Sequence, residues 1–145
     1  MMRDHAEDAA VRAAIQRETL NDYLARWHAW SHGKPMNGTD HIADPAFRDS
    51  ESYRGWETAD ELHDRNWLKF VLKTIDTIVT GDDRAHGAME SPYKDAIMIQ
   101  ARNLYTGFNV WVSQRLPRDS LKRAEILAEA RAILIRRMRT AGVVI

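Results

Sequence analysis

Residues 95–139 alternate between helix-forming runs and residues that end helices, which constrains the fold more than any other feature of the chain. Just before them, Ser91 and Pro92 make a favourable helix start, because a serine hydroxyl can accept from an early amide and a first-position proline loses no needed donor. Gly107 can adopt the left-handed conformation that ends a helix, and Pro117 denies a helix a further amide. The pattern predicts three helices separated by two short turns.

The middle helix of the three is expected over residues 108–114, which is long enough for about two helical turns. Its apolar side chains available for a core are Val110, Trp111 and Leu116. The third helix is capped by Asp119 or Ser120 and runs to about Thr140, with its apolar residues mostly on one stripe. These are Leu121, Ala124, Leu127, Ala128, Leu134, Ile135 and Met138.

Two helices joined by a tight turn, the second of them basic at its start, are typical of a helix-turn-helix that places a recognition helix in the major groove of DNA. Basic side chains would contact phosphates, and Ser120, Lys122 and Arg123 would reach base edges. The candidate DNA-binding residues are Arg115, Arg118, Ser120, Lys122 and Arg123. A helical hairpin whose basic face never touches nucleic acid is the alternative from this stretch alone.

The N-terminal part of the chain predicts one long helix followed by an irregular loop. Residues 5–32 carry apolar side chains at helical spacing, and residues 33–57 lose that pattern in a stretch rich in glycine, proline and small polar residues. A connection this long inside a compact domain is usually functional or disordered.

A second strong helix is expected over residues 58–80, opened by the capping box of Thr58 and Glu61. The chain contains no convincing strand pattern. The sequence therefore predicts a single all-α domain over residues 1–145, with four to five helices, a long irregular loop after the first helix, and a helix-turn-helix part over residues 92–141.

Trp27 and Trp30 lie three residues apart on one face of the first expected helix. Large aromatic side chains at that spacing bury much area against another helix. Core packing is the favoured interpretation, and docking of a partner protein is the alternative.

His28 and His32 have the spacing of metal ligands on a helix, and His41 could approach from the loop as a third ligand. The segment lacks the HExxH form, because Ala29 and Ser31 flank Trp30 between the two histidines. No glycine-rich phosphate loop, nucleophile elbow or pair of catalytic carboxylates is present. We therefore expect no enzyme, no metal and no cofactor, and keep a three-histidine metal enzyme as an alternative.

Charge is segregated along a chain whose net charge is zero. Residues 94–145 hold ten Lys or Arg and four Asp or Glu, a net charge of +6, and residues 1–93 hold eleven and seventeen, a net charge of −6. A basic C-terminal part is expected in a protein that binds the phosphate backbone of a nucleic acid. The chain has no cysteine, no apolar run long enough for a membrane span and no signal-peptide pattern, so we expect an intracellular protein without a membrane partner.

The order of these features resembles the late-gene antitermination proteins of lambdoid phages, the Q family, and in particular the small type. The resemblance covers residues 18–141 and depends on the opening segment LNDYLARWHAW, the helix LKFVLKTIDTIV and the block ARNLYTGFNVWVSQRLPRDSLKRAEILAEARAILIRRM. The part from Tyr93 on is also similar to the region-4 helix-turn-helix of sigma factors. By position, Ser113–Arg123 match the turn and the start of the recognition helix, and Trp27 and Trp30 match the aromatic pair of the first helix.

The resemblance implies a phage or prophage protein of the bacterial cytoplasm that binds double-stranded DNA near a late promoter and makes host RNA polymerase read through terminators. Some relatives carry cysteines that indicate a bound zinc, and because this chain has none, no metal is carried over. Two alternatives remain: a dimeric DNA-binding phage repressor or activator, and a helical interaction or assembly protein that does not bind DNA.

Overall fold

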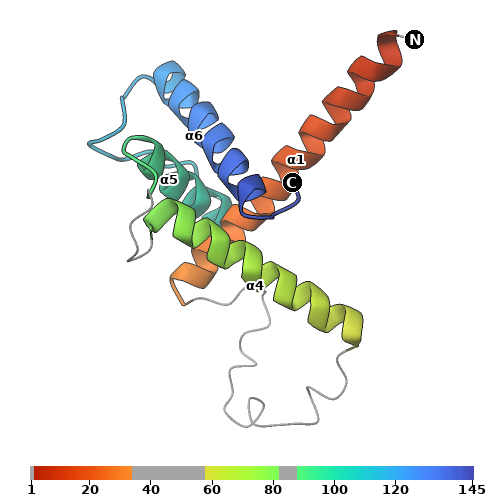
Figure 1. Ribbon diagram of the computed structural model, residues 1–145. Helices are drawn as coiled ribbons and strands as arrows, with labels where there is room; N and C mark the ends of the chain where they lie inside the picture. Colours follow the sequence, from red (N-terminus) through yellow and green to blue (C-terminus); the bar gives the residue numbers. More distant parts are fainter. Residues whose placement is uncertain (1, 34–57, 82–87) are drawn as a thin grey trace.

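Four helices and no strands make up the part of the chain that the computed structural model describes, residues 2–33, 58–81 and 88–145 (Figure 1). They are α1 (Met2–Ser31), α4 (Ala59–Thr80), α5 (Tyr93–Thr106) and α6 (Ser120–Thr140). The all-α fold expected from the sequence is confirmed. None of these helices is both long enough and apolar enough to cross a membrane. Most of the predicted loop over 33–57 lies outside the described residues.

Helix α4 begins where the sequence places its cap. The amide of Glu61 donates to Oγ1 of Thr58 at 3.1 Å, and the amide of Thr58 donates to a carboxylate oxygen of Glu61 at 3.4 Å. The amide of Gly81 donates to the carbonyl of Thr77 at 2.9 Å, and the helix ends there because the positive φ of Gly81, 82°, turns the chain out of the helix. Both ends of α4 are thus encoded locally.

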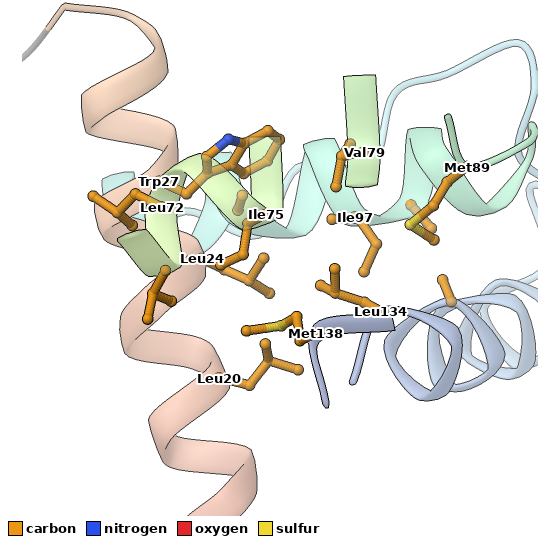
Figure 2. Packing of buried hydrophobic residues seen from close by; sticks show 14 of the residues in the cluster. Leu20, Leu24, Trp27, Leu72, Ile75, Val79, Met89, Ile97, Leu134 and Met138 are labelled. Atoms are coloured by element: carbon orange, nitrogen blue, oxygen red, sulfur yellow. The ribbon is translucent and has the colours of Figure 1, made fainter. Parts of the chain in front are cut away.

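The hydrophobic core lies where the four helices meet, and each contributes fully buried aliphatic side chains (Figure 2). The largest labelled members are Leu20 and Leu24 of α1, Leu72 and Ile75 of α4, Ile97 of α5, and Leu134 and Met138 of α6. The C-terminal part of the apolar stripe predicted for α6, with Leu134 and Met138, therefore faces the core, whereas the first residue of that stripe, Leu121, is 75% exposed.

Helix α1 joins the core only through its C-terminal half. Leu20 and Leu24 are fully buried, whereas the side chains of Val11 and Ile15 are 57% and 58% exposed. Val11 and Ile15 lie on the side of the helix opposite Leu20, since successive residues turn by about 100°. The N-terminal half of α1 therefore projects from the bundle (Figure 1).

Polar contacts tie the helices together at the edge of the core. A terminal nitrogen of Arg131 in α6 donates to Asn21 of α1 at 2.8 Å and to Gln100 of α5 at 2.6 Å. Burial, and secondarily the charge of Arg17, lower the pKa of Arg131. At the start of α5, a hydrogen bond with Glu129 of α6 raises the pKa of Tyr93.

The short helix expected over residues 108–114 is not formed, and α5 and α6 are joined by an irregular connection over residues 107–119. Phe108 and Val112 are 70% and 78% exposed, so a two-turn helix here would gain no core packing. Isolated helices of this length are unstable, and valine is a weak helix former. The tight turn of a helix-turn-helix is therefore not confirmed.

Candidate nucleic-acid interface

The connection over residues 107–119 is held against the end of α5 by specific hydrogen bonds. Gly107 ends α5 in the left-handed conformation, with φ 79°. The side-chain oxygen of the buried Asn103 accepts from the amide of Val110 at 3.3 Å, and the guanidinium of Arg102 donates to the carbonyl of Val110 at 3.1 Å. These bonds satisfy both backbone groups of Val110, so they replace the hydrogen bonds that a helix would have supplied.

The second half of the connection is fixed by side-chain packing and by the cap of α6. Leu116 is buried in the core. Trp111 is half-buried, and the guanidinium carbon of Arg123 lies 5.4 Å from the centre of a Trp111 ring, a cation–π distance. Asp119 caps α6 by accepting from the amide of Leu121 at 3.1 Å. The direction in which α6 leaves the connection is therefore set by several contacts.

The five candidate DNA-binding residues lie on this connection and on the first turn of α6, at an outer edge of the molecule (Figure 1). Arg118, Ser120 and Lys122 are exposed. Arg115 is also exposed, and one of its terminal nitrogens lies 3.7 Å from a carboxylate oxygen of Asp95 and 3.5 Å from Oγ of Ser91. Arg123 differs from the others, because it is half-buried against Trp111.

Part of this surface is not evident from the sequence pattern. Arg102 belongs to it, because its guanidinium is bonded to the connection. Val110 was expected in the core but is 46% exposed, and Phe108, Val112 and Leu121 are exposed by 70% or more. The alternation of apolar and polar residues at 108–110 was the available signal for extended rather than helical backbone.

The electrostatics of this surface favour an anionic partner. Residues 102–123 contain five Lys or Arg and one acidic residue, Asp119, which is engaged as the cap of α6. The amino end of a helix adds a partial positive charge to that of the side chains. We use the name basic surface for Arg102, Arg115, Arg118, Lys122 and Arg123. Because its positive charges are spread over several side chains, the basic surface suits a polyanion such as a chain of phosphates.

Both tryptophans of α1 take part in core packing. Trp27 is 3% exposed, and its indole nitrogen donates to a carboxylate oxygen of Asp76 at 3.2 Å. Trp30 is partly buried and packs against the core. Trp27 is therefore inaccessible to a partner in this fold, as the core-packing interpretation expects.

His28 and His32 lie side by side, with ring centres 4.2 Å apart, next to a cavity of about 490 Å³ between α1, α4 and α5. Nδ1 of His32 is 2.8 Å from the backbone carbonyl of His28, so one ring nitrogen is used at the helix end. Within the described residues, no three potential ligand side chains gather as a metal site would need. His41 lies outside those residues.

Comparison of the chain with protein-family models, with curated proteins and with solved structures gives no match.

Proposed function

We propose that this protein binds double-stranded DNA through the first turn of α6 and the basic surface around it. The observation that carries the proposal is the exposed amino end of α6, where Ser120, Leu121 and Lys122 all present their side chains to solvent beside Arg118. An α-helix fits the major groove, and its N-terminal residues are those that reach base edges.

The side chains at this end have complementary chemistry for the two parts of a DNA site. Arg115 and Arg118 are placed for phosphate contacts, which give affinity and orientation. Ser120 and Lys122 can form hydrogen bonds with base edges, and Leu121 can contact a thymine methyl group. Arg123 is held against Trp111, so we expect it to orient the helix and to contact phosphate at its free edge.

In this proposal the orientation of α6 is fixed by contacts other than those of an ordinary helix-turn-helix. A tight turn would fix the angle between α5 and the recognition helix. Here the buried Leu116, the Arg123 and Trp111 pair, and the Asp119 cap do so instead. Loss of these contacts should weaken DNA binding even if the exposed cations remain.

The finer proposal is transcription antitermination, in which the DNA-bound protein acts on RNA polymerase at a late promoter. It is supported by the resemblance of residues 18–141 to the Q proteins, and by the separation of a basic part from an acidic one. In this proposal the acidic part, residues 1–93, contacts polymerase while the basic surface holds DNA. A run-through transcription assay on a bound site tests it, and unchanged termination would contradict it.

A protein partner is the second candidate, and the exposed apolar side chains favour it. Phe108, Val112 and Leu121 lie on the same connection and helix end as the cations. An acidic partner with its own apolar face would cover both kinds of side chain. This candidate predicts no affinity for duplex DNA at physiological salt.

A matched pair of double variants tests the DNA proposal. Replacement of Arg118 and Lys122 with Ala removes two exposed cations from the basic surface, and replacement of Lys69 and Lys73 with Ala removes two exposed cations from α4. Fluorescence anisotropy with a duplex, over a salt titration, measures the DNA affinity of both double variants and its dependence on salt. We expect the first variant to bind weakly, with its log–log salt slope smaller by about 1, because Arg118 is the phosphate contact of the pair and each phosphate contact contributes about 1 to the slope. The α4 variant should bind as the wild type does. Equal effects of the two variants, or none, would contradict the proposal, provided that circular dichroism shows both folded.

A further inference from the structure

The cavity of about 490 Å³ between α1, α4 and α5 has no part in the DNA-binding proposal. Much of its wall is aromatic or apolar. Trp27 and His28 line it from the last turns of α1, His32 from just after that helix, and Met98 and Ile99 from α5. The ring centres of His28 and His32 are 4.2 Å apart, so the two imidazole rings lie in contact. A cavity of this size with such walls is typical of a small-molecule site.

Two carboxylates, those of Asp76 in α4 and Asp95 in α5, also line the cavity. One oxygen of Asp76 accepts from the indole nitrogen of Trp27 at 3.2 Å, which holds the carboxylate in place. Among the described residues that line the cavity, Arg102 alone carries a guanidinium or ammonium group, and it donates to the carbonyl of Val110 at 3.1 Å. Leaving the histidines aside, the lining therefore has more negative than positive charge.

The carboxylate of Asp95 lacks hydrogen-bond donors. Its side chain is only 19% exposed, and its Oδ2 is buried and accepts no hydrogen bond from any residue that the structure describes. Its Oδ1 lies 3.7 Å from a terminal nitrogen of Arg115, which is too long for a hydrogen bond. The side chain of Arg115 is 68% exposed, so water weakens this ion pair. A positively charged donor in the cavity would stabilise the carboxylate of Asp95.

We propose that this cavity binds a small organic cation, a primary amine or an amidine with an apolar body. The cationic group donates to Asp95, either oxygen of which can turn toward it because the terminal torsion of an aspartate is soft. The apolar body packs against the rings of His28 and His32 and against Met98. An anion would be repelled by the two carboxylates, and within the described residues no three ligand side chains gather for a metal ion. This proposal is independent of DNA binding.

The bound cation competes with Arg115 for Asp95. Both are positively charged, and the carboxylate of Asp95 is the group that they share. The arginine approaches Oδ1 from an exposed position, whereas the ligand approaches from the cavity, where it is less hydrated. Removal of the charge of Arg115 should therefore strengthen binding of the ligand. A cavity that merely accommodated apolar molecules would show no such effect.

Isothermal titration calorimetry of the full chain tests the ligand class with matched probes. Phenethylamine and benzamidine are the cations, and phenethyl alcohol and benzamide are their neutral analogues of nearly the same shape. We expect saturable binding of at least one cation at a single site, and no measurable binding of its neutral analogue. Absence of binding by both cations, or equal binding of cation and neutral analogue, would overturn the proposal.

Two variants place the cation beside Asp95. Asp95→Asn should weaken its binding at least about tenfold, because a hydrogen bond to a charged group is lost. Arg115→Gln should strengthen it about two- to fivefold, the effect expected for an exposed ion pair that no longer competes. Binding that is unchanged in Asp95→Asn, or no tighter in Arg115→Gln, would overturn the proposal.

The pair of Asp22 and Arg26 on α1 supplies the controls. Their side chains are exposed and form an ion pair of 3.1 Å, and neither lines the cavity. Asp22→Asn and Arg26→Gln therefore make the same chemical changes away from the site and should leave the affinity for the cation at its wild-type value. Circular dichroism checks that all four variants fold. A control that changes the affinity as much as its counterpart at the cavity would overturn the assignment to Asp95.

Discussion

The buried side chain of Asn103 helps to fix the path of the chain between α5 and α6. Its side-chain oxygen holds the amide of Val110 at 3.3 Å, and its backbone carbonyl accepts the amide of Gly107 at 2.9 Å. Without this bond the Val110 amide would have to seek another acceptor. The basic surface depends on this path, since Arg115 and Arg118 lie on the same connection.

Asn103→Ala should therefore loosen the connection while leaving the four-helix core intact. We expect a loss of about 1–2 kcal/mol in the free energy of unfolding, because a hydrogen bond is removed and a backbone donor is left without its partner. Urea unfolding followed by circular dichroism measures the loss. Affinity for duplex DNA should fall at the same time, with the salt slope unchanged because no cation is removed. Wild-type stability and affinity together would contradict this role of Asn103.

Tyr93 makes the contact between α5 and α6 sensitive to alkaline pH. Its hydrogen bond with Glu129, followed by the charge of that carboxylate, raises its pKa above the ordinary value of 10.0. A raised pKa in the folded state means that the contact stabilises the fold below pH 10.0 and loses this effect as the pH rises through the folded pKa. The difference in unfolding free energy between the wild type and Tyr93→Phe should shrink above pH 10.0. A constant difference through this range would contradict the assignment.

At the scale of the element, local sequence signals identify α4 and α6 well because their ends are encoded by nearby residues. The Thr58 and Glu61 box starts α4, and Asp119 caps α6, as the sequence predicts. The prediction of a helix over residues 108–114 was wrong for a physical reason. Phe108, Val110 and Val112 are exposed, and the bonds that fix this stretch come from Asn103 and Arg102 on the preceding helix.

The candidate site also has features that could be predicted from the sequence and features that could not. The cations of the basic surface that lie on or beside the first turn of α6 could be predicted, because charge and helix starts are visible in the sequence. The exposure of Val11, Ile15, Phe108 and Val112 could not, since it depends on which helices pack together. Helical spacing alone does not tell a core-facing stripe from a projecting one.

The capping box of α4 gives a prediction at the same scale. Thr58→Ala removes the side-chain oxygen that accepts from the amide of Glu61 at 3.1 Å. The free energy of unfolding should fall by about 1 kcal/mol, as is usual for loss of an N-terminal cap. Thr58→Ser, which keeps the hydroxyl, is the matched control and should retain most of that stability. Equal losses for both variants would show that the methyl group, rather than the cap, matters.

At the scale of the whole molecule, the chain separates two surfaces on opposite ends of α6. Its amino end carries the basic surface, with exposed Lys122 and Leu121, and near its carboxyl end Arg139 lines a groove against α1. The core between them is formed by all four helices. Exposed cations of the basic surface can therefore be replaced without removing side chains from the core.

The most direct test of the central claim is fluorescence anisotropy of the wild-type protein with a duplex library at roughly 150 mM salt, followed by selection of the bound sequences. We expect a selected duplex to be bound at least about a thousandfold more tightly than random duplex, which is a ratio typical of specific DNA readers. Absence of binding, or weak salt-sensitive binding without sequence preference, would contradict DNA recognition by α6 and favour a protein partner for the basic surface.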